Sequence, residues 1–122
     1  MQRTTRWSMT LLASLALISS GALAEDKKPD KKIERLWKAK CSSCHGMDGK
    51  AQTDKGKQMK VADYSTAAWQ KSRTDEQIKK GIIEGVKLEK DGVKQEMDGY
   101  KTELTAEQID GLVHFTRSLG PK

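Results

Sequence analysis

Cys41-Ser42-Ser43-Cys44-His45 is the stretch around which this 122-residue chain is organised, and its two cysteines are the only ones in the sequence. Two residues three positions apart on a helix lie on the same side. The sulfurs of Cys41 and Cys44 are therefore expected to face one site. The imidazole of His45 follows directly, so a nitrogen ligand stands beside the two thiols.

Cys-x-x-Cys-His is the attachment motif of a c-type haem. The two thiols can add to the vinyl groups on one edge of a porphyrin, and the histidine that follows lies where it can ligate the iron from one face. The motif predicts one covalent haem c, with Cys41 and Cys44 as its thioether attachments and His45 as the proximal iron ligand.

Three other sites compete with haem. A thioredoxin-like redox pair normally opens a helix inside a βαβ unit, and we recognise no apolar β-run in the chain. A zinc site could combine Cys41, Cys44, His45 and His114, but no second pair of cysteines or histidines completes it. A structural disulfide would close too short a loop to stabilise much. Haem is favoured over all three.

Residues 1–24 have the pattern of a secretory signal peptide. Two arginines precede an apolar run over residues 9–18, and Ala22-Leu23-Ala24 is a small-x-small cleavage site. The run is short for a membrane span, so we expect cleavage, export and no stable membrane insertion. An uncleaved anchor is the alternative. Residues 25–122 then form one domain.

The charge pattern limits the partners. The chain has a formal net charge of +6, with 33% charged and 5% aromatic residues. Both signs are mixed, and no basic stripe with interleaved aromatics is present, which argues against nucleic-acid binding. A modest positive charge favours partners with acidic docking patches. A chain with so many charged and so few aromatic residues has little apolar surface to bury and folds poorly by itself. A buried apolar prosthetic group would supply the missing apolar surface.

The fold class expected is all-α, with about four helices and long loops. Asp30 caps a helix that runs into the motif, and Thr74 and Thr105 each open a capping box. Residues 46–60 are expected to be loop, and residues 86–101 are left unassigned. The four expected helices cover about residues 30–45, 66–70 with Ser65 as cap, 74–84 ending at Gly85, and 105–119.

The sixth iron ligand has several candidates. Met47 follows His45 too closely to reach the opposite face of a porphyrin. His114 lies opposite the apolar stripe of the last helix, in solvent. Met59 lies in a loop and stays an alternative. Met97 is favoured as the distal ligand, because it lies far along the chain between two helices and has no apolar neighbours to pack with.

The chain resembles a small bacterial class I monohaem cytochrome c in three stretches. These are the Cys-x-x-Cys-His motif, the Gly46-Met47-Asp48-Gly49 that follows it, and the segment EMDGYKTELTAEQIDGLVHFTRSL (residues 96–119). In that family a methionine and an aromatic residue precede a Leu-Thr-x-x-Gln/Glu-Ile helix start, as Met97 and Tyr100 do here. The resemblance implies a cytochrome c fold wrapped around one haem. The first and last helices would cross, with Trp37 and Phe115 near the crossing.

Two positions depart from the family pattern. Asp98 stands where many members have proline, and could make the bond between Met97 and iron more labile. The proline whose carbonyl usually accepts from the proximal imidazole has no counterpart, so a carbonyl within residues 55–60 is expected to orient His45. Tyr64 and Trp69 could each bond a haem propionate, or simply fill the core.

The function implied is a soluble one-electron carrier with His/Met ligation, and not an enzyme. It would work as a monomer in the bacterial periplasm, shuttling electrons between exported or membrane redox proteins. Lys40, Lys50, Lys55 and Lys57 could rim the exposed haem edge. The alternative function is a haem-based sensor or a small haem enzyme, or its electron-entry subunit, with a labile sixth ligand.

Overall fold

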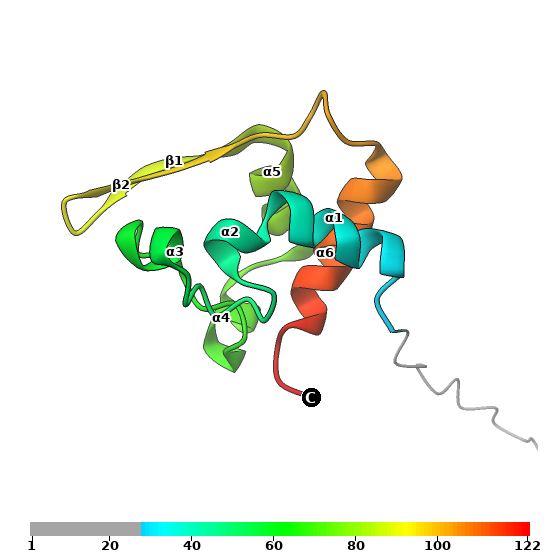
Figure 1. Ribbon diagram of the computed structural model, residues 1–122, viewed down its shortest axis with the longest axis horizontal. Helices are drawn as coiled ribbons and strands as arrows, with labels where there is room; N and C mark the ends of the chain where they lie inside the picture. Colours follow the sequence, from blue (N-terminus) through cyan, green and yellow to red (C-terminus); the bar gives the residue numbers. More distant parts are fainter. Residues whose placement is uncertain (1–27) are drawn as a thin grey trace, which may run out of the picture.

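Helices α1 (Lys31–Lys40) and α6 (Ala106–Ser118) pack against each other in the computed structural model, which describes residues 28–122 (Figure 1). At their crossing a Cβ on Gly111 would lie 2.6 Å from Cδ1 of Ile33, so a larger residue there would have to displace the Ile33 side chain. The predicted signal peptide, residues 1–24, lies outside the described residues. The core around the crossing consists of Trp37, Ile78, Ile82, Ile109, Leu112, Val113 and Phe115.

The long helices begin at the predicted caps. Asp30 accepts a hydrogen bond from the backbone N–H of Lys32. Thr74 and Thr105 each form the full capping box with the glutamine three residues later. Helix α5 (Asp75–Glu84) ends at Gly85, as expected. These starts are encoded locally, because a cap needs only its own side chain and the next turn.

The short helices differ in part from the predictions. The motif forms α2 (Ser42–His45), set off from α1 by a turn at Cys41. Residues 46–60, expected to be loop, contain α3 (Asp54–Gln58), which is capped by the hydroxyl of Thr53. Helix α4 (Ala67–Ser72) is capped by Thr66 rather than Ser65. The described chain thus has six helices instead of about four.

The unassigned segment is a β-hairpin, so the all-α expectation was wrong there. Strands β1 (Gly85–Lys90) and β2 (Val93–Asp98) pair antiparallel, with Val86 opposite Met97. The connecting residues Asp91 and Gly92 have φ of 50° and 75°, as a two-residue type I′ turn requires. Asp-Gly between alternating apolar residues is a hairpin signal that the sequence does contain.

The base of the hairpin is fixed to the end of α5. The backbone N–H of Tyr100 donates to the carbonyl of Ile82 at 2.9 Å, and that of Lys101 donates to Ile83 at 3.2 Å. These bonds satisfy carbonyls that a helix end leaves free. A Cβ on Gly99 would lie 2.5 Å from the Ile83 carbonyl oxygen. The strand that carries Met97 therefore returns to the end of α5 in a defined position. Among the described residues no helix is long and apolar enough to cross a membrane.

Candidate haem-binding site

The backbone of the motif is held by three hydrogen bonds from outside it. The indole Nε1 of Trp37 donates to the carbonyl of Gly46 at 2.9 Å, in the buried interior. The hydroxyl of Thr53 donates to the carbonyl of Cys44 at 3.2 Å, and the N–H of Ala51 donates to that of His45 at 2.9 Å. Three successive carbonyls are therefore fixed by α1 and by the segment that leads into α3.

Helix α3 lies directly against the motif. Gly56 is buried, and a Cβ there would collide with the carbonyl oxygen of Cys44 and lie 2.5 Å from that of Ala51. Only glycine allows α3 to approach so closely. This helix therefore supports the segment between Cys44 and Ala51.

The imidazole of His45 is neutral and nearly enclosed. It is 9% exposed, and burial lowers its pKa to about 4, so its nitrogens are not both protonated at neutral pH. Its Nδ1 is buried without a hydrogen-bond partner among the described residues. The carbonyl expected from residues 55–60 does not accept a hydrogen bond from it.

Both cysteine sulfurs are free and half-buried. Burial raises the pKa of Cys41 to about 11, with a smaller contribution from the neighbouring Cys44. The thiols are not joined in the disulfide weighed above. Within residues 28–122 no three histidine, cysteine, aspartate or glutamate side chains gather as a metal cluster, and His114 is exposed on α6. The structure does not assemble the zinc site weighed above.

The methionines considered as sixth ligands lie in different surroundings. Met97 is half-buried on β2, and Val86 is its cross-strand neighbour. Met59 is half-buried at the end of α3, and Met47 is 42% exposed. On the face that Met97 shares, Leu88 leaves 47% of its surface exposed. Val86, Leu88 and Met97 thus place three apolar side chains on one face of the hairpin.

Three aromatic rings pack at or near His45. Tyr64 stacks on His45 with ring centroids 4.7 Å apart and on Trp69 at 3.9 Å, and Trp37 lies 5.7 Å from His45. Tyr64 and Trp69 thus pack against the core. Whether they also bond a propionate stays a prediction.

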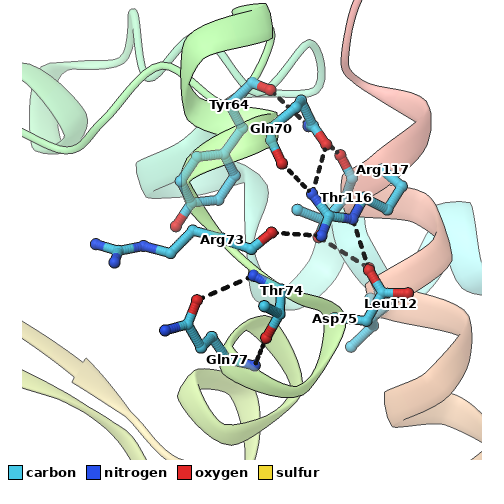
Figure 2. Close-up of polar contacts among 9 residues, drawn as sticks. All are labelled: Tyr64, Gln70, Arg73, Thr74, Asp75, Gln77, Leu112, Thr116 and Arg117. Atoms are coloured by element: carbon cyan, nitrogen blue, oxygen red, sulfur yellow. Dashed lines mark hydrogen bonds and ion pairs between the residues drawn. The ribbon is translucent and has the colours of Figure 1, made fainter.

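A polar cluster that sequence reasoning missed positions Tyr64 (Figure 2). The amide of Gln70 donates to the carbonyls of Tyr64 at 2.8 Å and Thr116 at 3.0 Å. Arg117 donates to the carbonyls of Gln70 and Arg73 and to the Asp75 carboxylate. These bonds join α4, α5 and α6. No local sequence pattern predicts them, because the partners are more than forty residues apart in the chain.

The predicted surface lysines are all exposed. One of them, Lys40, has its charge paired with Glu103 at 3.1 Å. Tyr100 donates its hydroxyl to the Lys40 carbonyl at 3.2 Å, so the end of α1 is tied to the residue that follows the hairpin.

The residues present fit a covalently bound haem: two free thiols, a buried neutral imidazole with an unpartnered ring nitrogen, and a half-buried methionine on a neighbouring hairpin. The sequence model of the family described as cytochrome c matches residues 31–120. The chain belongs to the cytochrome c family. Members of this family bind c-type haem and its iron covalently, and Cys41 and Cys44 fit the attachment motif.

Two solved structures resemble this cytochrome c. The c-type cytochrome KustC0563 is 31% identical, with a TM-score of 0.61, over 72% of this chain and 96% of that one. A tyrosine-to-phenylalanine mutant of that protein gives 31% identity and a TM-score of 0.59, over 71% of this chain and 96% of that one. No curated protein sequence matches. The expectation of a cytochrome c fold is therefore confirmed, with a hairpin and two additional short helices.

Proposed function

We propose that this cytochrome c is a one-electron carrier that works in the bacterial periplasm. In this proposal Cys41 and Cys44 hold the haem, His45 is the proximal ligand and Met97 is the distal ligand. The observation that carries it is the buried imidazole of His45 on a backbone whose carbonyls are fixed from three sides. A backbone held in this way can keep the ligand in place in both oxidation states, which keeps the structural reorganisation on electron transfer small.

The residues around the motif prepare it for the haem. Burial keeps His45 in the neutral form that can donate a lone pair. Trp37 and Thr53 fix the carbonyls on either side of His45. When bound, the haem supplies an iron that exchanges one electron between its ferrous and ferric states.

Met97 suits the distal role because its thioether is soft and favours ferrous iron. Two protein ligands leave no open coordination position, which favours a carrier over a sensor or enzyme. Asp98, which suggested a labile ligand, is exposed in the next position of β2. Successive side chains of a strand point to opposite faces, so its carboxylate lies away from Met97. Asp98 therefore gives no support to the rival function.

The partners proposed are redox proteins that present acidic patches. Lys50, Lys55 and Lys57 are exposed near the motif and carry positive charge toward such a partner. Association with it should slow as ionic strength rises. A rate that does not depend on salt would contradict this electrostatic docking.

The carrier function is tested on the purified exported protein. A pyridine haemochrome spectrum should show one haem bound through two thioethers, and the reduced protein should bind carbon monoxide slowly at neutral pH. Rapid carbon monoxide binding would support the sensor or enzyme instead. A colourless protein, after maturation in a host that attaches haem, would contradict both.

Export is tested separately, because it depends on residues outside the described part of the chain. The N-terminal sequence of the mature protein should begin at Glu25, after cleavage behind Ala24, and its mass should correspond to residues 25–122 with the haem attached. A mature protein that retains residues 1–24 would support an uncleaved anchor. The domain over residues 25–122 would be unaffected by that result.

A further inference from the structure

The hairpin places Gln95 on the same face as Met97. Residues two apart on a strand share a face, and Val93, Gln95 and Met97 are half-buried while Lys94 and Glu96 between them are exposed. This face of β2 is therefore turned toward the protein. Gln95 lies two residues further from the base of the hairpin than Met97.

The side chain of Gln95 joins the hairpin to the end of α3. Its Nε2 donates to the carbonyl of Met59 at 2.7 Å and to that of Lys60 at 2.8 Å. Both hydrogens of one amide are thus used. The other polar contact between these two segments within residues 28–122 runs from Nζ of Lys60 to the carbonyl of Asp91 and is long, at 3.5 Å.

The two acceptor carbonyls lie on a rigid turn. The N–H groups of Lys60 and Val61 donate to the carbonyls of Lys57 and Gly56, which is the Schellman arrangement at a helix end. Lys60 has a φ of 49°, the left-handed conformation this arrangement requires. The carbonyls that Gln95 binds are therefore fixed in direction.

The same helix is attached to the haem motif at its other end. Thr53, the cap of α3, donates to the carbonyl of Cys44, and Gly56 packs against that carbonyl. A continuous path of contacts thus runs from Cys44 through α3 to Gln95 and on to Met97. It connects the segment that holds the proposed proximal ligand with the strand that holds the proposed distal one.

We propose that Gln95 is a positioning residue: its amide latches the Met97 strand to α3 and holds the thioether at the haem. The inference rests on the proposed function, because it takes Met97 as the distal ligand. The hairpin base is already fixed at α5 by Tyr100 and Lys101. Gln95 fixes the strand on the other side of Met97, so that both ends of the ligand segment are anchored.

The test compares variants of the haem-loaded protein. Gln95→Leu keeps the approximate size of the side chain and removes its donors, whereas Gln95→Lys keeps a donor. Two observables report on Met97: the pH at which the far-red sulfur-to-iron band disappears, and the rate of carbon monoxide binding to the reduced form. The loss of two hydrogen bonds should raise the equilibrium constant for detachment of Met97 from the iron about tenfold. Gln95→Leu should therefore lower the band's pH midpoint by about one unit and speed carbon monoxide binding about tenfold, and Gln95→Lys should restore much of both.

Thr105→Ala is the control for a general loss of stability. It removes the side chain that caps α6 and leaves the hairpin contacts intact. It should lower the thermal midpoint while leaving the band and the carbon monoxide rate within twofold. Equal effects of Thr105→Ala and Gln95→Leu on the band would overturn the proposal, as would an unchanged band in Gln95→Leu.

Met97→Ala separates the two levels of the inference. If Met97→Ala loses the far-red band and Gln95→Leu behaves like the wild type, the positioning role of Gln95 is overturned and the proposed function stands. If Met97→Ala keeps the band, the ligand assignment is overturned, and the role of Gln95 falls with it.

Discussion

The indole of Trp37 and the phenyl ring of Phe115 lie with centroids 4.9 Å apart, where α1 crosses α6. Both are buried, with exposures of 3% and 6%. Trp37 also donates to the carbonyl of Gly46, so the crossing and the haem motif share one side chain. A change at the crossing is therefore transmitted to the residue that follows His45.

Enlarging Gly111 tests the crossing. Gly111→Ala would force a methyl group against Ile33 and should lower the free energy of unfolding by about 1–2 kcal/mol, because overpacking separates the helices. Guanidinium denaturation of the haem-loaded protein measures it. Gly81→Ala in α5 is the matched control, since a Cβ there meets only Cγ2 of Val86 at 3.8 Å. It should stabilise by about 0.5–1 kcal/mol, the helix-propensity gain.

Arg117→Lys tests the cluster that joins three helices. Arg117 donates to Gln70, Arg73 and Asp75, and a lysine cannot reproduce that planar fork. We expect a loss of about 1–3 kcal/mol in the free energy of unfolding. Lys80→Ala serves for comparison, because the Lys80–Glu84 pair is exposed and 3.8 Å apart; it should cost no more than about 0.5 kcal/mol. Equal losses in the two variants would contradict the importance of the cluster.

The two tyrosines should titrate above their usual range. Burial raises the pKa of Tyr64 to about 12, partly offset by the nearby Arg73, and burial also raises the pKa of Tyr100. Because the native state holds the Tyr64 proton more tightly, Tyr64 contributes stability below pH 10. This contribution is lost as the pH rises from about 10 to about 12. Ultraviolet titration of the wild type and Tyr64→Phe should assign the later transition to Tyr64. A transition near pH 10 that is present in the wild type and missing in Tyr64→Phe would contradict the raised pKa of Tyr64.

Alanine substitutions at two glycines of the hairpin distinguish the effect of backbone strain from that of a steric collision. Gly85 and Gly92 have φ of 78° and 75°, so alanine is disfavoured at both by about 1 kcal/mol. A Cβ on Gly85 would also collide with the carbonyl of Met97, whereas nothing lies near Gly92. Gly85→Ala should therefore weaken the far-red band, and Gly92→Ala should leave it unchanged. The absorption spectrum of each oxidised variant at neutral pH decides between these outcomes.

The features that sequence reasoning predicted depend on local interactions. The caps at Asp30, Thr74 and Thr105 need only neighbouring residues. The pairing of Trp37 with Phe115 followed from the family resemblance and is confirmed by the structure.

The features that were missed have two different causes. The hairpin has a local signal in Asp91-Gly92, which the polar composition of the segment obscured. Helix α3 is only five residues long, and its position depends on Gly56 packing against Cys44. The bonds from Gln95 and Arg117 join residues more than thirty positions apart. No pattern along the chain could predict them, because they exist only once the helices have packed.

The measurement that tests the central claim most directly is the absorption spectrum of oxidised Met97→Ala beside that of Met59→Ala. Both methionines are half-buried, so each variant removes one half-buried thioether. We predict that the far-red sulfur-to-iron band disappears in Met97→Ala and remains in Met59→Ala. A band that survives in Met97→Ala, or that is lost only in Met59→Ala, would contradict the account.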